Sequence, residues 1–131
     1  MSSGDLGKAF ADGEVIIRAG EEGDCMYVIQ EGQAEVVIGS GGDEIQLDVL
    51  GPGAFFGEMA VFERDVRSAT VRALGEARVI TVDKKNFMRR VHEDPALAFR
   101  LVETMSYRVR NLTNKLAELE SLLERNSSAE L

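Results

Sequence analysis

The distribution of glycine divides this chain into two parts of different character. The chain has 13 glycines among 131 residues, and all of them lie between positions 4 and 75. Glycine weakens helices and is common where a chain turns tightly. The sequence therefore predicts a segment rich in turns up to about residue 82, followed by a helical segment.

The glycine-rich part has the pattern of antiparallel β-structure. Short runs rich in Val and Ile, with apolar and polar residues alternating, are separated from one another by glycines: VIIR, MYVIQ, AEVVI, EIQLDVL, SATVRAL and ARVITV. Such runs predict strands split by glycines, in a β-roll or jelly-roll barrel over residues 13–82. The periodicity leaves a jelly roll and an up-and-down barrel both open. Residues 2–11 are expected to form a short helical lead-in.

Two aspartates mark the starts of two helices in the glycine-free part. Asp83 can cap a helix over residues 84–91, and Asp94 followed by Pro95 places Asp at the N-cap and Pro at the first helical position. Neither Gly nor Pro follows Pro95, so the second helix is expected to reach about Arg125, with residues 126–131 fraying. The predicted fold class is α+β and mainly β, a roll followed by C-terminal helices over residues 83–125.

The long helix carries a row of apolar residues at close to heptad spacing. The row consists of Leu101, Met105, Val109, Leu112, Leu116, Leu119 and Leu123. A sustained repeat of about 3.5 residues is typical of a coiled coil. An amphipathic helix lying on its own barrel explains the row equally well up to about Val109. Beyond Leu112 such a barrel is too short to cover it, so we expect a homodimer formed through the helix over residues 95–125.

Composition excludes several classes of function. The 15 basic and 23 acidic residues give a net charge of −8, which argues against nonspecific binding to nucleic acid or to an anionic membrane. A single Cys and a single His cannot build an intrachain disulfide or a multi-Cys or multi-His metal site. No Ser-His-Asp or Cys-His arrangement is recognisable, so we expect no enzyme, no catalytic residue, no metal and no cofactor. The chain shows no signal peptide and no membrane-length apolar run, and the lone Cys25 favours a cytoplasmic location.

One stretch combines charged and apolar residues in a way that points to a ligand. Residues 55–72 read FFGEMAVFERDVRSATVR. Gly57 allows close approach of the backbone, and a single helical turn over residues 58–61 would direct N–H groups at an anion. Arg67 and Ser68 suit phosphate oxygens, whereas the acceptor-only carboxylate of Glu58 suits sugar hydroxyls. The alternative is a structural Glu58–Arg67 ion pair at the barrel rim, which contributes little when exposed.

The same stretch resembles the phosphate-binding cassette of cyclic nucleotide-binding domains. The run GEMAV at 57–61, followed by RSATV at 67–71, is similar to the family's F-G-E-x-A-L followed by R-x-A-T/S-V. The glycine-punctuated runs at 19–24, 26–29, 31–32 and 50–53 also match, so the resemblance covers about residues 13–123. The chain is identified on these motifs as similar to the catabolite-activator (CRP/FNR-like) superfamily.

The resemblance implies a ligand set. The cyclic phosphate would be held by Gly57, Met59, Ala60, Arg67 and Ser68, and the ribose 2′-hydroxyl by Glu58. The long helix would close over the base, with Val49, Arg108, Leu112 and Thr113 as base contacts. Leu112 stands where the catabolite-activator branch has a base-reading Thr. Ser68 is typical of cAMP-responsive bacterial members, so cAMP is expected ahead of cGMP.

The prediction is a cyclic nucleotide sensor that relays binding through its long helix. Residues 1–131 are expected to form a single domain, without the helix-turn-helix DNA-binding part of catabolite activators. One alternative is a degenerate domain that has lost its ligand and serves as a dimerisation or scaffold module. The other is the effector-domain fragment of a transcription regulator.

Overall fold

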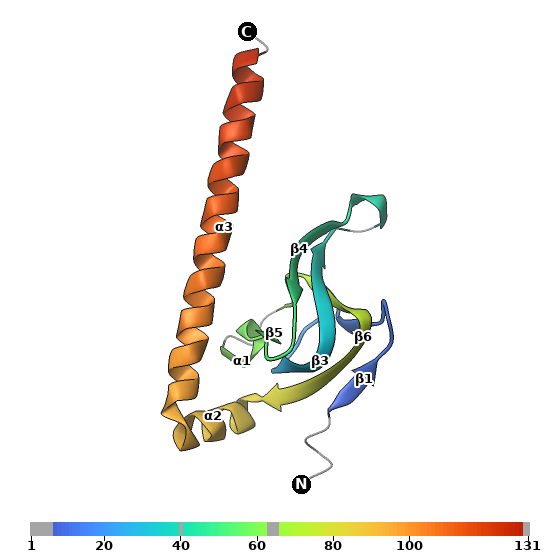
Figure 1. Ribbon diagram of the computed structural model, residues 1–131, viewed down its shortest axis with the longest axis vertical. Coiled ribbons are helices and arrows are strands. Elements are labelled where there is room, and N and C mark those ends of the chain that lie inside the picture. The colour runs from blue at the N-terminus through green and yellow to red at the C-terminus, as the bar shows by residue number, and fades with distance from the viewer. Residues whose placement is uncertain (1–6, 40, 63–65, 130–131) are drawn as a thin grey trace. The chain divides into compact units, whose positions relative to one another are not determined.

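The computed structural model describes residues 7–39, 41–62 and 66–129. The chain divides into two compact units, Met1–Phe87 and Met88–Leu131. The first unit contains the antiparallel sheet and the short helix α1, and the second consists of helix (Figure 1). That residues 1–131 act as one domain stays a prediction.

The described part of the first unit contains a six-stranded antiparallel sheet. Its elements are β1 (Lys8–Phe10), β2 (Val15–Ile17), β3 (Cys25–Ile38), the 3-10 helix η2 (Gly41–Asp43), β4 (Ile45–Leu50), β5 (Phe55–Phe56), α1 (Met59–Phe62) and β6 (Thr70–Asp83). The sheet order is β1-β6-β3-β4, with β2 paired to β6 and β5 paired to β3. Figure 1 shows β3 and β6 as the two long central strands. This architecture confirms the predicted β-roll.

The two long strands differ from the prediction that glycines would split them. Both β3 and β6 run through a glycine for 14 residues. Their pairing shifts register on both sides of Glu31, so the extra residues form a β-bulge. Gly32 has a φ of 81°, and a Cβ there would collide with the carbonyl oxygen of Glu76. Gly32 therefore permits a bulge and a close approach of two backbones, where the sequence pattern predicted the end of a strand.

Burial follows the two faces of the sheet. Leu50, Ala34 and Ala73 lie opposite one another on β4, β3 and β6, and all three belong to the hydrophobic core. Adjacent residues of a strand point to opposite faces. The neighbouring row, Val49, Glu35 and Arg72, therefore lies on the face away from this core. On that face the Nε of Arg72 is 3.2 Å from a carboxylate oxygen of Glu35.

The predicted N-terminal helical lead-in is wrong for those of its residues that the structure describes. Residues Lys8–Phe10 form strand β1, in which Lys8 pairs with Val79 of β6. Phe10 is 8% exposed and joins the core, which favours the strand over a solvent-exposed helix. The earlier residues of the predicted lead-in, 2–6, lie outside the described residues.

Both predicted C-terminal helices are present. Helix α2 spans Lys84–Glu93, and the backbone N–H of Asn86 donates to Oδ1 of Asp83 at 2.8 Å, which confirms the predicted cap. Helix α3 spans Pro95–Ala129 and so begins where the sequence predicted. It continues four residues beyond the predicted end at Arg125, because no Gly or Pro interrupts the chain there.

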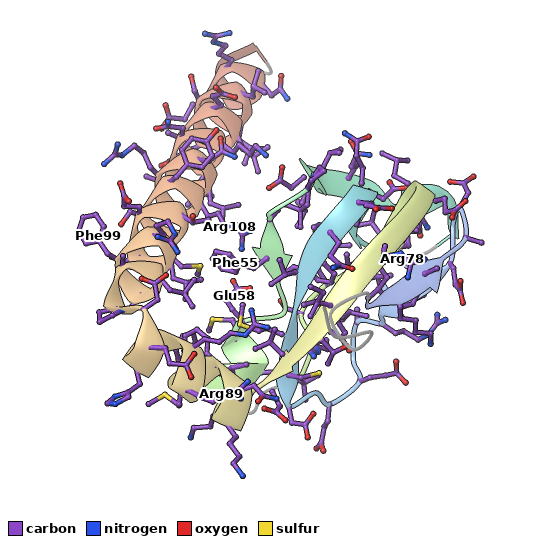
Figure 2. The ribbon with its side chains drawn as sticks, turned by 60° about the horizontal axis from the view of Figure 1, so that its bottom comes forward. Phe55, Glu58, Arg78, Arg89, Phe99 and Arg108 are labelled. Carbon is purple, nitrogen blue, oxygen red and sulfur yellow. The ribbon has the colours of Figure 1, made fainter. Side chains whose placement is uncertain are left out.

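Most of the apolar row on α3 is exposed in the single chain. Leu101 is 9% exposed, but the later members of the row are between 54% and 65% exposed: Val109, Leu112, Leu116, Leu119 and Leu123. Figure 2 also shows Phe99, which is 67% exposed, projecting outward from this helix. A soluble helix that exposes a regular leucine row has an apolar face to cover.

Candidate functional site

The cassette begins where β5 is anchored to the core. Phe55 and Phe56 are both buried, and they pair with Val28 and Tyr27 of β3. Directly after this strand, the N–H of Ala60 donates to the Gly57 carbonyl at 3.3 Å. Helix α1 follows, so the predicted single helical turn after Gly57 is confirmed.

The backbone of Arg67 is held by the loop between β2 and β3. The N–H of Arg67 donates to the carbonyl of Glu21, and the N–H of Gly20 donates to the carbonyl of Arg67, both at 2.8 Å. An antiparallel bridge between Glu22 and Val66 extends this pairing. These backbone hydrogen bonds fix the position of Arg67 in the fold independently of its side chain.

The guanidinium of Arg67 has defined partners on two sides. Its Nη1 donates to the carbonyl of Gly57 at 2.9 Å, and its Nη2 donates to the carbonyl of Cys25 at 2.7 Å. Its Cζ lies 5.9 Å from the ring centroid of Tyr27, which is within cation–π range. The hydrogen bonds of this guanidinium therefore go to two backbone carbonyl oxygens, those of Gly57 and Cys25.

Tyr27 connects this site to the core. Its ring stacks on Phe56, with centroids 5.3 Å apart and an interplanar angle of 17°. Burial, together with a hydrogen bond to Cys25, raises the pKa of Tyr27 to about 12. The phenol therefore stays protonated and neutral at physiological pH, and the ring can face a guanidinium without contributing a charge.

Glu58 is a buried carboxylate at the start of α1. It is 9% exposed, whereas charged side chains are seldom buried without polar partners. Figure 2 shows Glu58 and Phe55 beside one another near β5 and α1. The cassette therefore combines a buried acceptor group with a fixed cation, Arg67, on the same short stretch of chain.

The other residues predicted for the phosphate differ in their exposure. Ser68 is exposed and follows Arg67 directly, and Met59 is 48% exposed. Ala60 is 4% exposed, so its contribution to a ligand is limited to the backbone. The structure thus brings Gly57, Ala60 and Arg67 together through the contacts given above.

The structure does not bring Val49 into this group. Val49 is 39% exposed and lies opposite Glu35, on the sheet face away from the core row of Leu50. Arg108, Leu112 and Thr113 lie on α3 in the second unit, and as base contacts they stay a prediction. The Thr113 hydroxyl donates to the Val109 carbonyl at 2.9 Å, so it already serves the helix backbone.

Three members of the site were not assigned from the sequence. Tyr27 belongs to the run MYVIQ, which predicts only a strand, and Cys25 directly precedes that run. Gly23 belongs to a run that predicts only a turn. The guanidinium of Arg67 contacts the first two, and it occupies the space that a side chain at Gly23 would need. A backbone carbonyl carries no sequence signal, because every residue has one.

The described residues contain no candidate for a membrane-spanning helix or for a metal site. No helix in the described ranges is both long and apolar enough to span a bilayer. No group of three or more His, Cys, Asp or Glu side chains that could hold a metal ion is found among them either.

Comparison with known proteins decides the family. Residues 8–94, more than half of the chain, match the family model of the cyclic nucleotide-binding domain. The chain belongs to this family. The cassette and the antiparallel roll described above are the parts of this domain that the sequence pattern had pointed to, and the assignment to the CRP/FNR-like superfamily is confirmed.

Curated relatives match this cyclic nucleotide-binding domain over part of their own length. A protein of Rhodopseudomonas palustris named as a potassium channel is 38% identical over 82% of this chain and 26% of its own length. The cAMP-dependent protein kinase regulatory subunit of Blastocladiella emersonii is 42% identical over 62% of this chain and 20% of its own length. The chain thus spans about a fifth to a quarter of these two relatives.

Solved structures share the fold. The Thermus thermophilus catabolite activator protein has a TM-score of 0.75 and 25% identity, over 86% of this chain and 54% of that one. The regulatory domain of Toxoplasma gondii PKA, crystallised with cAMP, has a TM-score of 0.59 and 32% identity, over 73% of this chain and 38% of that one. The cyclic nucleotide-binding domain therefore resembles domains of both a catabolite activator protein and the regulatory domain of PKA.

Proposed function

We propose that this cyclic nucleotide-binding domain is a non-catalytic sensor of cAMP, with cGMP as a weaker ligand. The observation that carries the proposal is the guanidinium of Arg67, which neutral carbonyl oxygens hold next to Gly57. A cation fixed by neutral acceptors keeps its positive charge for a further anion. Support for cAMP comes from the kinase regulatory subunit named for its cAMP dependence and from the Toxoplasma domain crystallised with cAMP.

Each part of the ligand has a proposed partner. Arg67 would donate its remaining N–H groups to the cyclic phosphate, together with the Ser68 hydroxyl and the backbone of Gly57, Met59 and Ala60. The Glu58 carboxylate would accept a hydrogen bond from the ribose 2′-hydroxyl. Base contacts are proposed for Arg108, Leu112 and Thr113 on α3. Val49 on β4 stays a further proposed base contact, and its row lies on the sheet face away from Leu50.

We propose further that α3 relays ligand binding within a homodimer. The exposed leucines at 112, 116, 119 and 123 follow one another at spacings of about 3.5 residues and would cover one another in a parallel pair of helices. A ligand can shift the arrangement of such a pair only by its different affinity for the two states. Base contacts on the same helix that dimerises would supply that difference.

Calorimetric titration of the purified chain with cAMP and with cGMP tests the ligand. Arg67→Ala is expected to weaken cAMP binding by about 2–5 kcal/mol, because it removes a charged hydrogen-bond partner from a bound anion. Arg78→Ala is the matched control: Arg78 lies on β6, where its Nη1 is 3.5 Å from the Gly7 carbonyl (Figure 2). Its affinity should equal that of the wild type.

A wild-type protein that gives no heat and no shift in melting temperature with millimolar cyclic nucleotide would refute the ligand. The second candidate would then hold, a domain that keeps the fold and serves as a dimerisation module. The exposed leucine row on α3 favours that candidate independently of any ligand.

A further inference from the structure

Gly23 occupies a position where the backbone does not require glycine. Its φ is not among the positive values found at other glycines of the chain, so an L-residue could adopt this conformation. It lies half-buried in the loop between β2 and β3, next to Asp24. The reason for a glycine here must therefore be sought in its surroundings.

The space beside Gly23 is taken by the side chain of Arg67. A Cβ built on Gly23 would collide with Nε, Cζ and Nη2 of Arg67, and these are the three nearest atoms. All of them belong to the far end of one flexible side chain. The loop backbone, in contrast, is pinned by the hydrogen bonds of Gly20 and Glu21 with Arg67. An added methyl group at Gly23 would therefore move the guanidinium and leave the backbone in place.

The guanidinium has little freedom to move without losing its partners. The carbonyls of Gly57 and Cys25 accept its hydrogen bonds at 2.9 and 2.7 Å, and the Tyr27 ring faces it. Hydrogen bonds weaken steeply beyond these distances and away from linearity. A shift large enough to clear a Cβ would break at least one of them.

We infer that Gly23 is a positioning residue for Arg67. Because Gly23 has no side chain, the guanidinium fits between Gly23, the Tyr27 ring and the carbonyls of Gly57 and Cys25. These contacts hold the guanidinium in position for a ligand phosphate. The consequence for ligand binding rests on the proposed function, whereas the effect of Gly23 on the position of the guanidinium is independent of it.

A double-mutant cycle tests the inference by calorimetry with cAMP. Gly23→Ala is expected to weaken binding about ten- to hundredfold, the range for losing a hydrogen bond to a charged group. In the Arg67→Ala background, the same substitution should change affinity less than about twofold, because the added methyl group has no guanidinium to displace. Gly51→Ala is the control: its φ is not positive, no atom lies within 4 Å of the added Cβ, and wild-type affinity is expected.

A second readout needs no ligand. The Nε–H resonance of Arg67 in the nitrogen-15 NMR spectrum of the free protein should be distinct in the wild type and in Gly51→Ala. In Gly23→Ala it should move to the position of mobile arginines, while backbone amide resonances of the sheet stay unchanged. Circular dichroism and thermal unfolding would verify that the variant is folded.

Three results would overturn the inference. The first is a Gly23→Ala protein with wild-type affinity, and the second is one with an unchanged Arg67 resonance. The third is an equal loss of affinity with and without Arg67, which would mean that the substitution acts through the backbone. If the wild type binds neither cAMP nor cGMP, the proposed function fails, and the Arg67 resonance alone decides whether Gly23 positions the guanidinium.

Discussion

Alanine substitutions at Gly32 and Gly75 should separate two energetic costs that glycine avoids in this sheet: backbone strain at positive φ and steric collision with a neighbouring strand. Both glycines have positive φ, 81° and 75° respectively. Alanine in this left-handed region costs roughly 1–2 kcal/mol, partly offset by about 0.4–1 kcal/mol from the reduced entropy of the unfolded chain. Gly75→Ala meets no atom within 4 Å of its Cβ, so the net loss of stability should be about 1 kcal/mol.

Gly32→Ala adds a steric cost to the same backbone strain. Its Cβ would collide with the carbonyl oxygen of Glu76 and lie 2.9 Å from the Cα of Ala77. Both neighbours are backbone atoms of β6, so relief requires the paired strands to separate or shift. Overpacking of this kind typically costs about 1–3 kcal/mol. Gly32→Ala should therefore destabilise the protein by about 1–3 kcal/mol more than Gly75→Ala.

Equilibrium urea unfolding followed by circular dichroism measures both variants. The comparison holds if the slope of the unfolding free energy against urea is the same in the two variants. Equal midpoints for the two variants would refute the reasoning, because close backbone approach at Gly32 would then contribute nothing. A larger loss for Gly75→Ala would refute it as well.

Three further results are expected. Asp83→Ala should cost about 1 kcal/mol in urea unfolding, because it removes the α2 cap, and no change would contradict the cap. Hydrogen bonds from Gln46, and secondly from Arg72, lower the pKa of Glu35 in the folded state. The ionised Glu35 therefore stabilises the fold above its unfolded pKa of about 4.3, and this stabilisation is lost as the pH falls through the lower folded pKa. The unfolding free energy of Glu35→Gln should accordingly fall less than that of the wild type on acidification, and parallel curves would contradict this. Sedimentation should give twice the chain mass for the wild type and the single mass for Leu116→Glu, and a wild-type monomer at high concentration would exclude the helix pair.

Local signals in the sequence predicted local structure well. The cap at Asp83 and the start of α3 at Pro95 depend on residues within one helical turn, and both are confirmed. The turn after Gly57 is of the same kind. The end of α3 was placed too early, because Asn and Ser after Arg125 are weak helix formers without being breakers.

Features that depend on residues distant in sequence were harder to predict. Gly32 looked like the end of a strand, because the carbonyl of Glu76 that requires the glycine belongs to another strand. Val49 stays a predicted base contact, and the sheet face that it occupies is decided by the pairing of β4 with β3, because a shift of one residue reverses that face.

The same difference between local signals and distant residues applies to the candidate site. Arg67 was found from its side-chain chemistry and its spacing from Gly57, both of which can be read in the sequence. The groups that hold it, a carbonyl at Cys25 and the ring of Tyr27, are brought to it by the pairing of β3 with its neighbours. Patterns therefore point to a candidate ligand-binding residue more readily than to the residues that orient it.

The long pairing of β3 with β6 has a consequence for the kinetics of folding. The register joins Cys25 to Asp83 at one end and Val37 to Thr70 at the other, so the ladder closes a large loop that contains the whole cassette. Loops of this length must lose their entropy before the contacts that stabilise them form, which slows folding. We therefore expect the cassette to assemble only as the sheet closes. A ligand bound there would stabilise the closed ladder, and its presence should appear first as a slower rate of unfolding.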